Sequence, residues 1–244
     1  MRKWLFETLY KNRYLYRFAS TVPFAGQWRT WQRLVLARLH GTDVLELGCG
    51  LGDLLVDMLQ RGYHCQAIEQ SPEMVAAARA TLQKRGVGQP TLVMQGSAQS
   101  LPFSSGTFDS VVSTFPSEYI HDPNTISEVA RVLRPDGRLI VIEGANLLPS
   151  GMIQPLLLLV HLLVYGPKVI FGPRPHVQRR AEQQQAQANV EAETEEVITE
   201  VVPDAQFGRF IPLERCGLRR HSEWVHSPRW EAYVTIGEKK SVQP

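Results

Sequence analysis

A glycine-rich turn flanked by carboxylates is the segment best suited to binding a small ligand. Gly48, Gly50 and Gly52 follow the short, mostly apolar run 43–47. Glycines at this spacing let the backbone turn tightly and approach a ligand closely. A helix that begins after the turn presents free N–H groups to negative charge on the ligand. Glu69 follows 17 residues after Gly52, and a carboxylate at the end of a second strand suits hydrogen bonds to ribose hydroxyls.

The glycine spacing separates two kinds of adenosine ligand. A dinucleotide fingerprint is GxGxxG, and its third glycine would fall on Asp53. The turn is GxGxG instead, and Glu46 adds negative charge two residues before the first glycine. A pyrophosphate disfavours such charge. The turn therefore favours a ligand that carries an ammonium group and no phosphate over NAD.

The elements that must position this turn alternate between strands and helices. Ser71 is a predicted N-cap, Pro72 takes the first helical position, and Arg134 to Gly137 has the composition of a turn. Strands alternating with helices predict a parallel sheet with both faces covered. The predicted strands are 43–47, 65–69, 91–95, 108–113 and 138–143, the predicted helices are 54–61, 74–84 and 126–133, and 219–225 with 232–237 alternate like a terminal antiparallel hairpin.

These motifs, over residues 40–145, resemble the class I S-adenosylmethionine-dependent methyltransferases, in the subgroup that acts on small molecules, quinones and lipids. The family motifs are matched by 46–52 (first motif), Glu69 (ribose-binding acid), 95–103 (adenine-lining segment), 108–113 (fourth strand) and 126–139 (helix, turn and strand). More loosely, 211–218 resembles the family's last helix. The resemblance implies an α/β fold with a doubly wound, mostly parallel seven-stranded sheet and a C-terminal antiparallel hairpin.

The resemblance also implies S-adenosylmethionine as the cofactor. Ser97 stands where many members have an aspartate that bonds the adenine amino group, which leaves that contact to the backbone or Gln99. Tyr14, Tyr16 and Phe18 are candidates for the aromatic residue that, in the family, closes over the cofactor. Of these, Tyr16 is predicted to contact the cofactor. The implied cofactor-binding residues are Glu46, Gly48, Cys49, Gly50, Gly52, Glu69, Gln70, Met74, Ser97, Ala98, Thr114 and Tyr16.

Methyl transfer requires mainly that the acceptor be aligned with the sulfonium and that water be excluded. A base is needed only if the acceptor loses a proton. Candidates follow the fourth strand, where open α/β sheets bind ligands: Glu118, Tyr119 and His121 could face the acceptor, and Phe115 could wall the cofactor. The family has no invariant base, so the catalytic residue stays open.

Composition excludes other functions. With 26 basic and 24 acidic residues the net charge is +2, which argues against a nucleic-acid partner. The three cysteines have no metal-site spacing and favour a reducing cytoplasm, and Cys49 is expected to be a small loop residue rather than a nucleophile.

Charge and apolar residues divide the chain into regions. Residues 1–40 carry eight basic residues and one acidic residue and form a predicted helical cap, without the apolar region of a signal peptide. Residues 41–146 and 203–244 form the predicted methyltransferase core, and 147–202 an insertion with an apolar part and an acidic part. The apolar stretch 152–171 is interrupted by prolines, and packing in the core, a lid over the substrate and contact with a membrane all remain open.

The predicted function is methyl transfer from S-adenosylmethionine to a small hydrophobic acceptor, with a membrane surface as an additional partner. Two alternatives stay open: a module that binds the cofactor without catalysis, and an NAD-dependent oxidoreductase. The sequence leaves the acceptor, its reacting atom and the oligomeric state undetermined.

Overall fold

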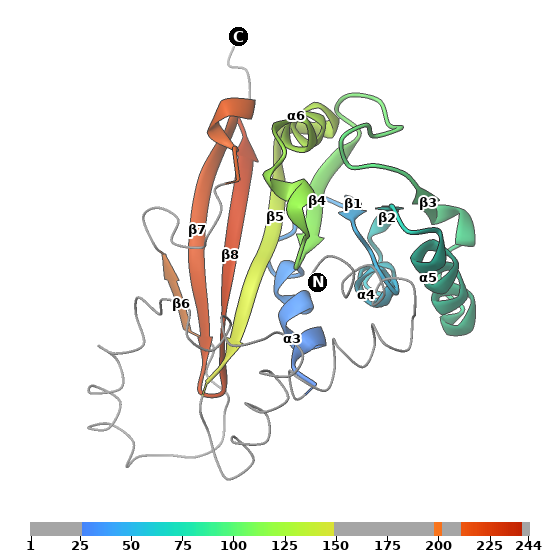
Figure 1. The fold of residues 1–244 in the computed structure, drawn as a ribbon, viewed down its shortest axis with the longest axis horizontal. Helices are drawn as coiled ribbons and strands as arrows, with labels where there is room; N and C mark the ends of the chain where they lie inside the picture. Colours follow the sequence, from blue (N-terminus) through green and yellow to red (C-terminus); the bar gives the residue numbers. More distant parts are fainter. Residues whose placement is uncertain (1–25, 149–197, 202–210, 241–244) are drawn as a thin grey trace, which may run out of the picture.

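The structure, a computed structural model, describes residues 26–148, 198–201 and 211–240 (Figure 1). Its strands are β1 (Asp43–Leu47), β2 (His64–Glu69), β3 (Val93–Gln95), β4 (Phe108–Thr114), β5 (Leu133–Leu147), β6 (Ile198–Val201), β7 (Leu218–Ser227) and β8 (Trp230–Lys239). Its helices are α3 (Trp28–Gln32), α4 (Asp53–Gln60), α5 (Pro72–Arg85) and α6 (Pro123–Val132), with short 3₁₀ helices η1 (Arg33–Val35), η2 (Pro90–Leu92), η3 (Glu118–His121) and η4 (Glu214–Cys216).

The strands form one sheet in the order β3-β2-β1-β4-β5-β8-β7-β6. β1 to β5 pair in parallel, whereas β8, β7 and β6 pair antiparallel. This arrangement confirms the predicted α/β class with its C-terminal antiparallel hairpin. The seven strands indicated by the sequence are joined at one edge by an eighth, β6, which lies within residues 147–202.

The helix that follows β2 begins and ends as its sequence predicts. The Ser71 hydroxyl accepts a hydrogen bond from the Met74 backbone N–H at 3.3 Å, and Pro72 occupies the first helical position. Gly86 ends α5 in a left-handed conformation with φ of 64°, which glycine adopts without steric penalty.

Three predicted boundaries differ from the structure. The third strand begins at Val93 rather than at residue 91, because Pro90 starts η2. The predicted turn 134–137 is a bulge inside β5: Leu133 pairs with Phe108 and Arg138 with Ser110, so four residues loop out between them. The helix expected over 211–218 is only η4, bounded by Pro212 and by Gly217 at φ of 80°.

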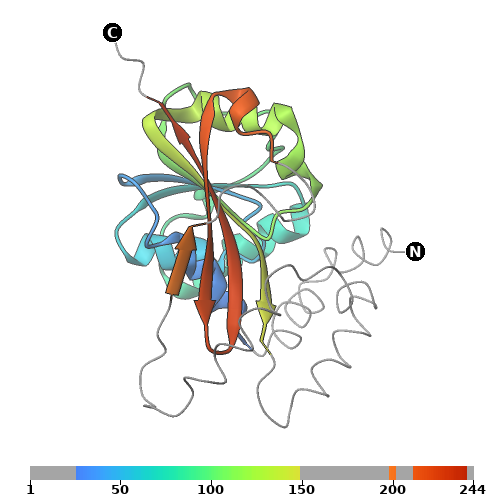
Figure 2. The ribbon, with the colours of Figure 1, turned by 90° about the vertical axis from the view of Figure 1, so that its left-hand side faces the viewer.

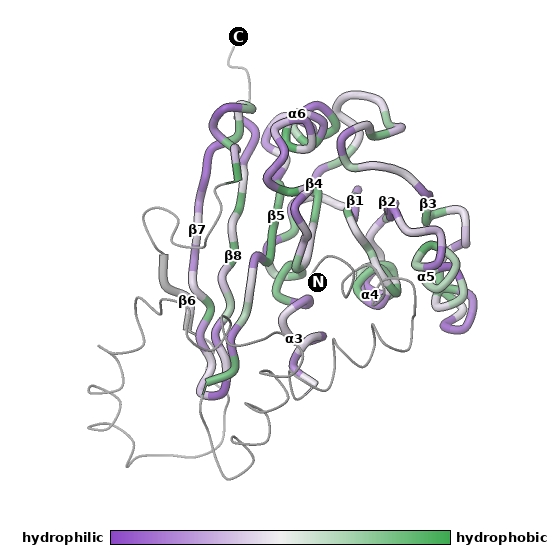
Figure 3. The backbone as a smooth tube through the Cα atoms, viewed as in Figure 1, coloured by the Kyte–Doolittle hydropathy of each residue, from purple (hydrophilic) through white to green (hydrophobic). Residues whose placement is uncertain are grey.

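Two apolar layers cover the sheet. α3, α4 and α5 pack on one face, with Trp31, Leu54 and Leu82 among their buried residues. α6 covers the other face through Ile126 and Val129. In Figure 2 the β7–β8 hairpin faces the viewer. Figure 3 shows that hydrophobic residues are concentrated in the parallel strands and that β7 is more hydrophilic.

Several predictions fall outside the described residues. They are Tyr16 and most of the N-terminal cap, the apolar stretch 152–171, and most of the insertion 147–202. Among the described helices, none is long and apolar enough to cross a membrane.

Candidate functional site

The glycine turn between β1 and α4 has a backbone that other residues would not adopt easily. Gly48, Gly50 and Gly52 have φ of 70°, 54° and 76°. A Cβ atom on Gly48 would lie 2.8 Å from the Tyr119 hydroxyl, and one on Gly52 would lie 3.1 Å from the Ala78 Cβ. The glycines therefore permit both the conformation of the turn and its close packing.

Glu69 joins the turn to the carboxyl end of β2. One carboxylate oxygen accepts a hydrogen bond from the Gly50 N–H, and the other accepts one from the Ser71 N–H, both at 3.0 Å. Each oxygen keeps a second lone pair that can accept a hydrogen bond. The carboxylate is thus held in place and retains capacity for a ligand that donates two hydroxyl groups.

Glu46 lies on the same face of the sheet and is 1% exposed. Its Oε2 atom has no hydrogen-bond partner among the described residues. Burial, and then the charges of Glu69, Asp53 and Asp57, raise the pKa of Glu46 well above its usual value. A buried acceptor without a donor is destabilising, and a cationic donor bound here would satisfy it.

The N-terminal helical segment is attached to α4 by ion pairs. Arg29 contacts Asp53 and Asp57, each at 2.8 Å, and Arg33 contacts Asp57 at 2.8 Å. Burial acts to raise the pKa of Asp57, but hydrogen bonds and charge from Arg33 and Arg29 outweigh it, so the pKa is lowered. These contacts fix α3 beside the helix that begins at the glycine turn.

The same segment also reaches the carboxyl end of β4. The Gln32 side-chain amide donates to the Thr114 hydroxyl at 3.3 Å. Trp28 stacks on Phe115 with ring centroids 4.2 Å apart, and Trp31 approaches the same ring edge-on at 6.1 Å. Phe115 has φ of 50°, a conformation that costs a non-glycine residue about 1–2 kcal/mol. An aromatic wall therefore stands beside Thr114.

The segment predicted to line the adenine is held by side-chain hydrogen bonds. The Ser97 hydroxyl donates to the Gln99 side-chain oxygen, and the Gln99 amide donates to Asp122 at 3.3 Å. Ala98 is half-buried and Gln70 is exposed, whereas Met74 is buried against Leu51 of the glycine turn. Ser97 and Gln99 thus act as one polar unit.

The three candidate catalytic residues lie on η3 in different surroundings. Glu118 is exposed at the start of the helix, and His121 is half-buried at its end. The Tyr119 hydroxyl donates to the Leu47 carbonyl at 3.0 Å and lies 2.7 Å from the Ser113 hydroxyl. Tyr119 therefore holds η3 against the end of β1, beside the glycine turn.

Cys49 is buried in the glycine turn. Burial first, and then the charges of Glu46 and Glu69, raise the pKa of its thiol well above the usual value. A thiol kept protonated is a poor nucleophile. The described residues also contain no group of three potential metal ligands.

Sequence reasoning missed the α3 residues and Glu143. The α3 contacts join residues 24 to 82 positions apart, and no local pattern predicts them. In the sequence Glu143 ends the predicted strand 138–143, as Glu69 ends the predicted strand 65–69. That shared position at the carboxyl edge was the available signal.

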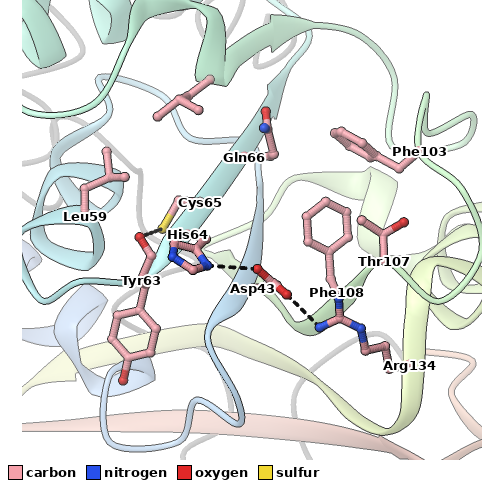
Figure 4. A pocket seen from close by; sticks show the side chains of 11 residues that line it. Asp43, Leu59, Tyr63, His64, Cys65, Gln66, Phe103, Thr107, Phe108 and Arg134 are labelled. Carbon is pink, nitrogen blue, oxygen red and sulfur yellow. Dashed lines mark hydrogen bonds and ion pairs between the residues drawn. The ribbon is translucent and has the colours of Figure 1, made fainter.

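A separate depression of about 500 Å³ lies at the opposite edge of the sheet (Figure 4). It is lined by residues at the starts of β1, β2 and β4, among them Asp43, His64 and Phe108. The carboxylate of Asp43 contacts His64 at 3.2 Å and Arg134 at 2.7 Å. These neighbouring side chains in the depression already occupy this carboxylate. The glycine turn and the carboxylates of Glu46 and Glu69 lie at the other ends of these strands.

Comparison with known proteins agrees with this geometry. Residues 45–141 match a family model described as a methyltransferase domain. The chain is 32% identical over 149 residues to a demethylmenaquinone methyltransferase of Symbiobacterium thermophilum, covering 58% of this chain and 58% of that protein. It is 33% identical over 143 residues to a demethylmenaquinone methyltransferase of Corynebacterium glutamicum, covering 57% of each. The matches span less than two thirds of the relatives' length.

A solved structure from Methanococcus maripaludis, described provisionally as an S-adenosyl-L-methionine-dependent methyltransferase, shares the fold. Its TM-score is 0.55 at 14% identity, and the alignment covers 96% of this chain and 94% of that chain. Residues 45–141 are thus similar to a methyltransferase domain, and the described part of the chain, with its glycine turn, Glu69 and strand order, shares the fold of this solved structure.

Proposed function

We propose that this chain transfers a methyl group from S-adenosylmethionine to a quinone-type acceptor, a demethylated menaquinone in its hydroquinone form. The observation that carries the cofactor assignment is the unsatisfied Oε2 atom of Glu46, buried on the same face as Glu69. The quinone-type acceptor is supported by the names of the relatives and by the aromatic wall of Trp28 and Phe115.

The described residues fit the parts of the proposed cofactor. Glu69 would accept hydrogen bonds from the ribose hydroxyls, and Glu46 would accept one from the ammonium group of the methionine part. The glycine turn and the first N–H groups of α4 would accommodate the methionine carboxylate. When bound, the cofactor supplies an electrophilic methyl group on a sulfonium. The hydrogen bond from Tyr119 to the Leu47 carbonyl holds η3 beside the glycine turn.

The charges around the turn argue against the NAD-dependent alternative. Glu46, Glu69, Asp53 and Asp57 are close enough for the other three to raise the pKa of Glu46. A pyrophosphate would add negative charge to this cluster, whereas a ligand with an ammonium group would reduce the repulsion. A non-catalytic module stays the second alternative, and it predicts cofactor binding without methyl transfer.

We also propose that the protein acts in the cytoplasm at a membrane surface, because a menaquinone precursor is lipid-soluble and residues 152–171 are apolar. The test is flotation with liposomes of anionic and zwitterionic lipids. Replacing Leu157, Leu158 and Leu162 by serine should reduce the floated fraction of a folded protein. Unchanged flotation would contradict the membrane proposal but leave the cofactor assignment intact.

The proposed reaction is tested by incubating the full chain with S-adenosylmethionine labelled in its methyl group and a short-chain demethylmenaquinone reduced by dithionite. We expect label in the extracted quinone, with a product mass increased by one methylene. A second arm without dithionite should give little label, because the oxidised ring is a poor nucleophile. Binding of S-adenosylhomocysteine without label transfer would contradict the acceptor and favour the non-catalytic module.

A further inference from the structure

The carboxyl edge of β5 contains an irregularity that directs one carboxylate. Ile142 pairs with Val234 and Gly144 pairs with Tyr233, so Glu143 is an extra residue between two successive pairs of the β5–β8 ladder. A bulge of this kind leaves its residue outside the pairing and re-aims its side chain, and bulges are frequent beside active sites. The bulge lies next to the end of β4, because Ile142 also pairs with Thr114.

A second irregularity lies beside the first on the neighbouring strand. Phe115 takes a left-handed conformation directly after β4, and its N–H donates to the Ile142 carbonyl at 2.8 Å. Strained backbone persists where the surrounding structure holds it, and such residues cluster at functional sites. Two adjacent strands therefore both depart from regular geometry at the edge that carries the glycine turn.

The Glu143 carboxylate is held by a short series of hydroxyls. Thr235 donates to one carboxylate oxygen of Glu143, and the Thr235 hydroxyl lies 3.2 Å from the hydroxyl of Ser222, where both side chains are buried. Thr235 lies opposite Val141, on the sheet face that also carries Tyr119. Glu143 itself is only half-buried.

We propose that Glu143 is the general base that takes the hydroxyl proton from the acceptor of this methyltransferase. This assignment rests on the proposed function. It deepens that function by naming a residue that neither the family motifs nor the predicted candidates Glu118, Tyr119 and His121 include.

All bonds, electrons and protons of the proposed methyl transfer are accounted for. The acceptor ring carbon forms a bond to the methyl carbon as the sulfonium–methyl bond breaks, and that bond's electron pair stays on sulfur. The hydroquinone hydroxyl proton moves to Glu143, which leaves a neutral keto intermediate. Glu143 then returns this proton to the oxygen as the ring C–H proton leaves to water, and the hydroquinone is regenerated. No oxidant or reductant is consumed.

The surroundings of Glu143 shift its pKa in the direction that suits a general base. Burial raises the pKa of Glu143, and the hydrogen bond from Thr235 and the charge of Arg220 oppose this without cancelling it. Bases are most effective when their pKa lies near the working pH. The other titratable or charged groups that share this face of the neighbouring elements are Tyr119 on η3, Tyr233 and Glu231 on β8, His226 on β7, and Glu214, which contacts Arg220.

The test measures kcat against pH for the full chain with reduced short-chain demethylmenaquinone. The variants are Glu143→Gln, Glu143→Asp and the control Glu238→Gln, which removes a carboxylate of β8 opposite Arg138, where the pairing of β5 with β8 begins. We expect wild-type kcat to rise with pH through the raised pKa. Glu143→Gln should lower kcat by about 10²–10⁴-fold and abolish this rise. Glu143→Asp should keep partial activity with the rise, and Glu238→Gln should match wild type.

Binding of S-adenosylhomocysteine separates the possible failures. It should stay within about twofold of wild type in Glu143→Gln if the residue acts on the acceptor alone. A Glu143→Gln enzyme with wild-type kcat and pH dependence would overturn the assignment, as would one with reduced kcat that keeps the wild-type rise. If wild type itself transfers no methyl group to the hydroquinone, the proposed acceptor and this assignment both fail.

Discussion

At the scale of single residues, the site is defined by carboxylates whose surroundings differ. Glu69 has both oxygens satisfied by backbone N–H groups, whereas Glu46 is buried with one oxygen unsatisfied. Asp57, by contrast, is held ionised by two arginines. The position of Glu46 and Glu69 relative to the glycines was predictable from motif spacing, but the electrostatic state of each depends on residues brought together by the fold.

Glu46→Gln should stabilise the free protein and weaken cofactor binding. The raised pKa means that the folded protein binds a proton more tightly than the unfolded chain, so the free energy of unfolding falls as pH rises above the unfolded pKa of about 4.3. The neutral amide removes this loss and should raise the free energy of unfolding by about 1–3 kcal/mol at pH 8. Urea unfolding at pH 5 and pH 8 checks this.

Ionisation of Glu46 has the opposite effect on cofactor binding: it lowers the stability of the free protein but should strengthen binding. An ammonium ligand favours the ionised form of Glu46, so binding of S-adenosylhomocysteine should release a proton and tighten as pH rises. Calorimetry in buffers of different ionisation enthalpy measures the proton release. Equal proton release by wild type and Glu46→Gln would assign the proton to another group and contradict this account of Glu46.

At the scale of elements, the structure shows how the N-terminal segment and the first helix act together. Arg29 and Arg33 attach α3 and η1 to α4, and Gln32 and Trp28 of the same segment reach the end of β4. The helical pattern of this segment was visible in the sequence, but its partner was not, since the contacts are long-range. The predicted turn at 134–137 likewise had the right composition, but it became a bulge because β5 begins before it and continues after it.

Asp57→Asn should loosen this attachment. The change leaves Arg33 without its charged partner, while Arg29 keeps its pair with Asp53. Breaking a fully buried pair costs about 3–5 kcal/mol, and the loss should be smaller here because both guanidinium groups are partly exposed. Arg219→Gln, which removes an exposed pair with Glu238, should change the free energy of unfolding by less than about 0.5 kcal/mol. Chemical denaturation compares the two.

The pH dependence of this pair has a defined direction. Because the pKa of Asp57 is lowered in the folded protein, its stabilising contribution is present above the unfolded pKa and is lost as pH falls through the folded pKa. The difference between wild type and Asp57→Asn should therefore shrink in acid. A difference that is constant from neutral pH to strong acid would contradict the ion-pair explanation.

Two glycine substitutions separate the effect of a steric clash from the effect of backbone conformation. Gly48→Ala and Gly62→Ala both place a side chain at positive φ, which costs about 1–2 kcal/mol. Only the Cβ on Gly48 would meet an atom, the Tyr119 hydroxyl at 2.8 Å, whereas Gly62 has open space. Gly48→Ala should thus be the more destabilising and should abolish S-adenosylhomocysteine binding, with Gly62→Ala binding normally. Thermal unfolding and calorimetry distinguish the outcomes, and normal binding by Gly48→Ala would contradict the assigned site.

At the scale of the whole molecule, chemistry concentrates at one edge of the sheet. The glycine turn, Glu69 and Thr114 lie where parallel strands end, as open α/β sheets require, and Glu143 lies within β5 beside the end of β4. Alternation of strands and helices predicted this edge and the fold class. It did not predict β6, whose four residues carry too short a pattern, nor the bulge that presents Glu143, since bulges depend on the pairing between β5 and β8.

Calorimetric titration of the full chain with S-adenosylhomocysteine tests the central claim most directly. We expect saturable binding by wild type, a loss of about 10- to 100-fold in affinity for Glu69→Ala, which removes charged hydrogen bonds to the ribose, and wild-type binding by the control Glu214→Gln. Failure of the intact, folded chain to bind, with Glu69→Ala indistinguishable from it, would contradict the account.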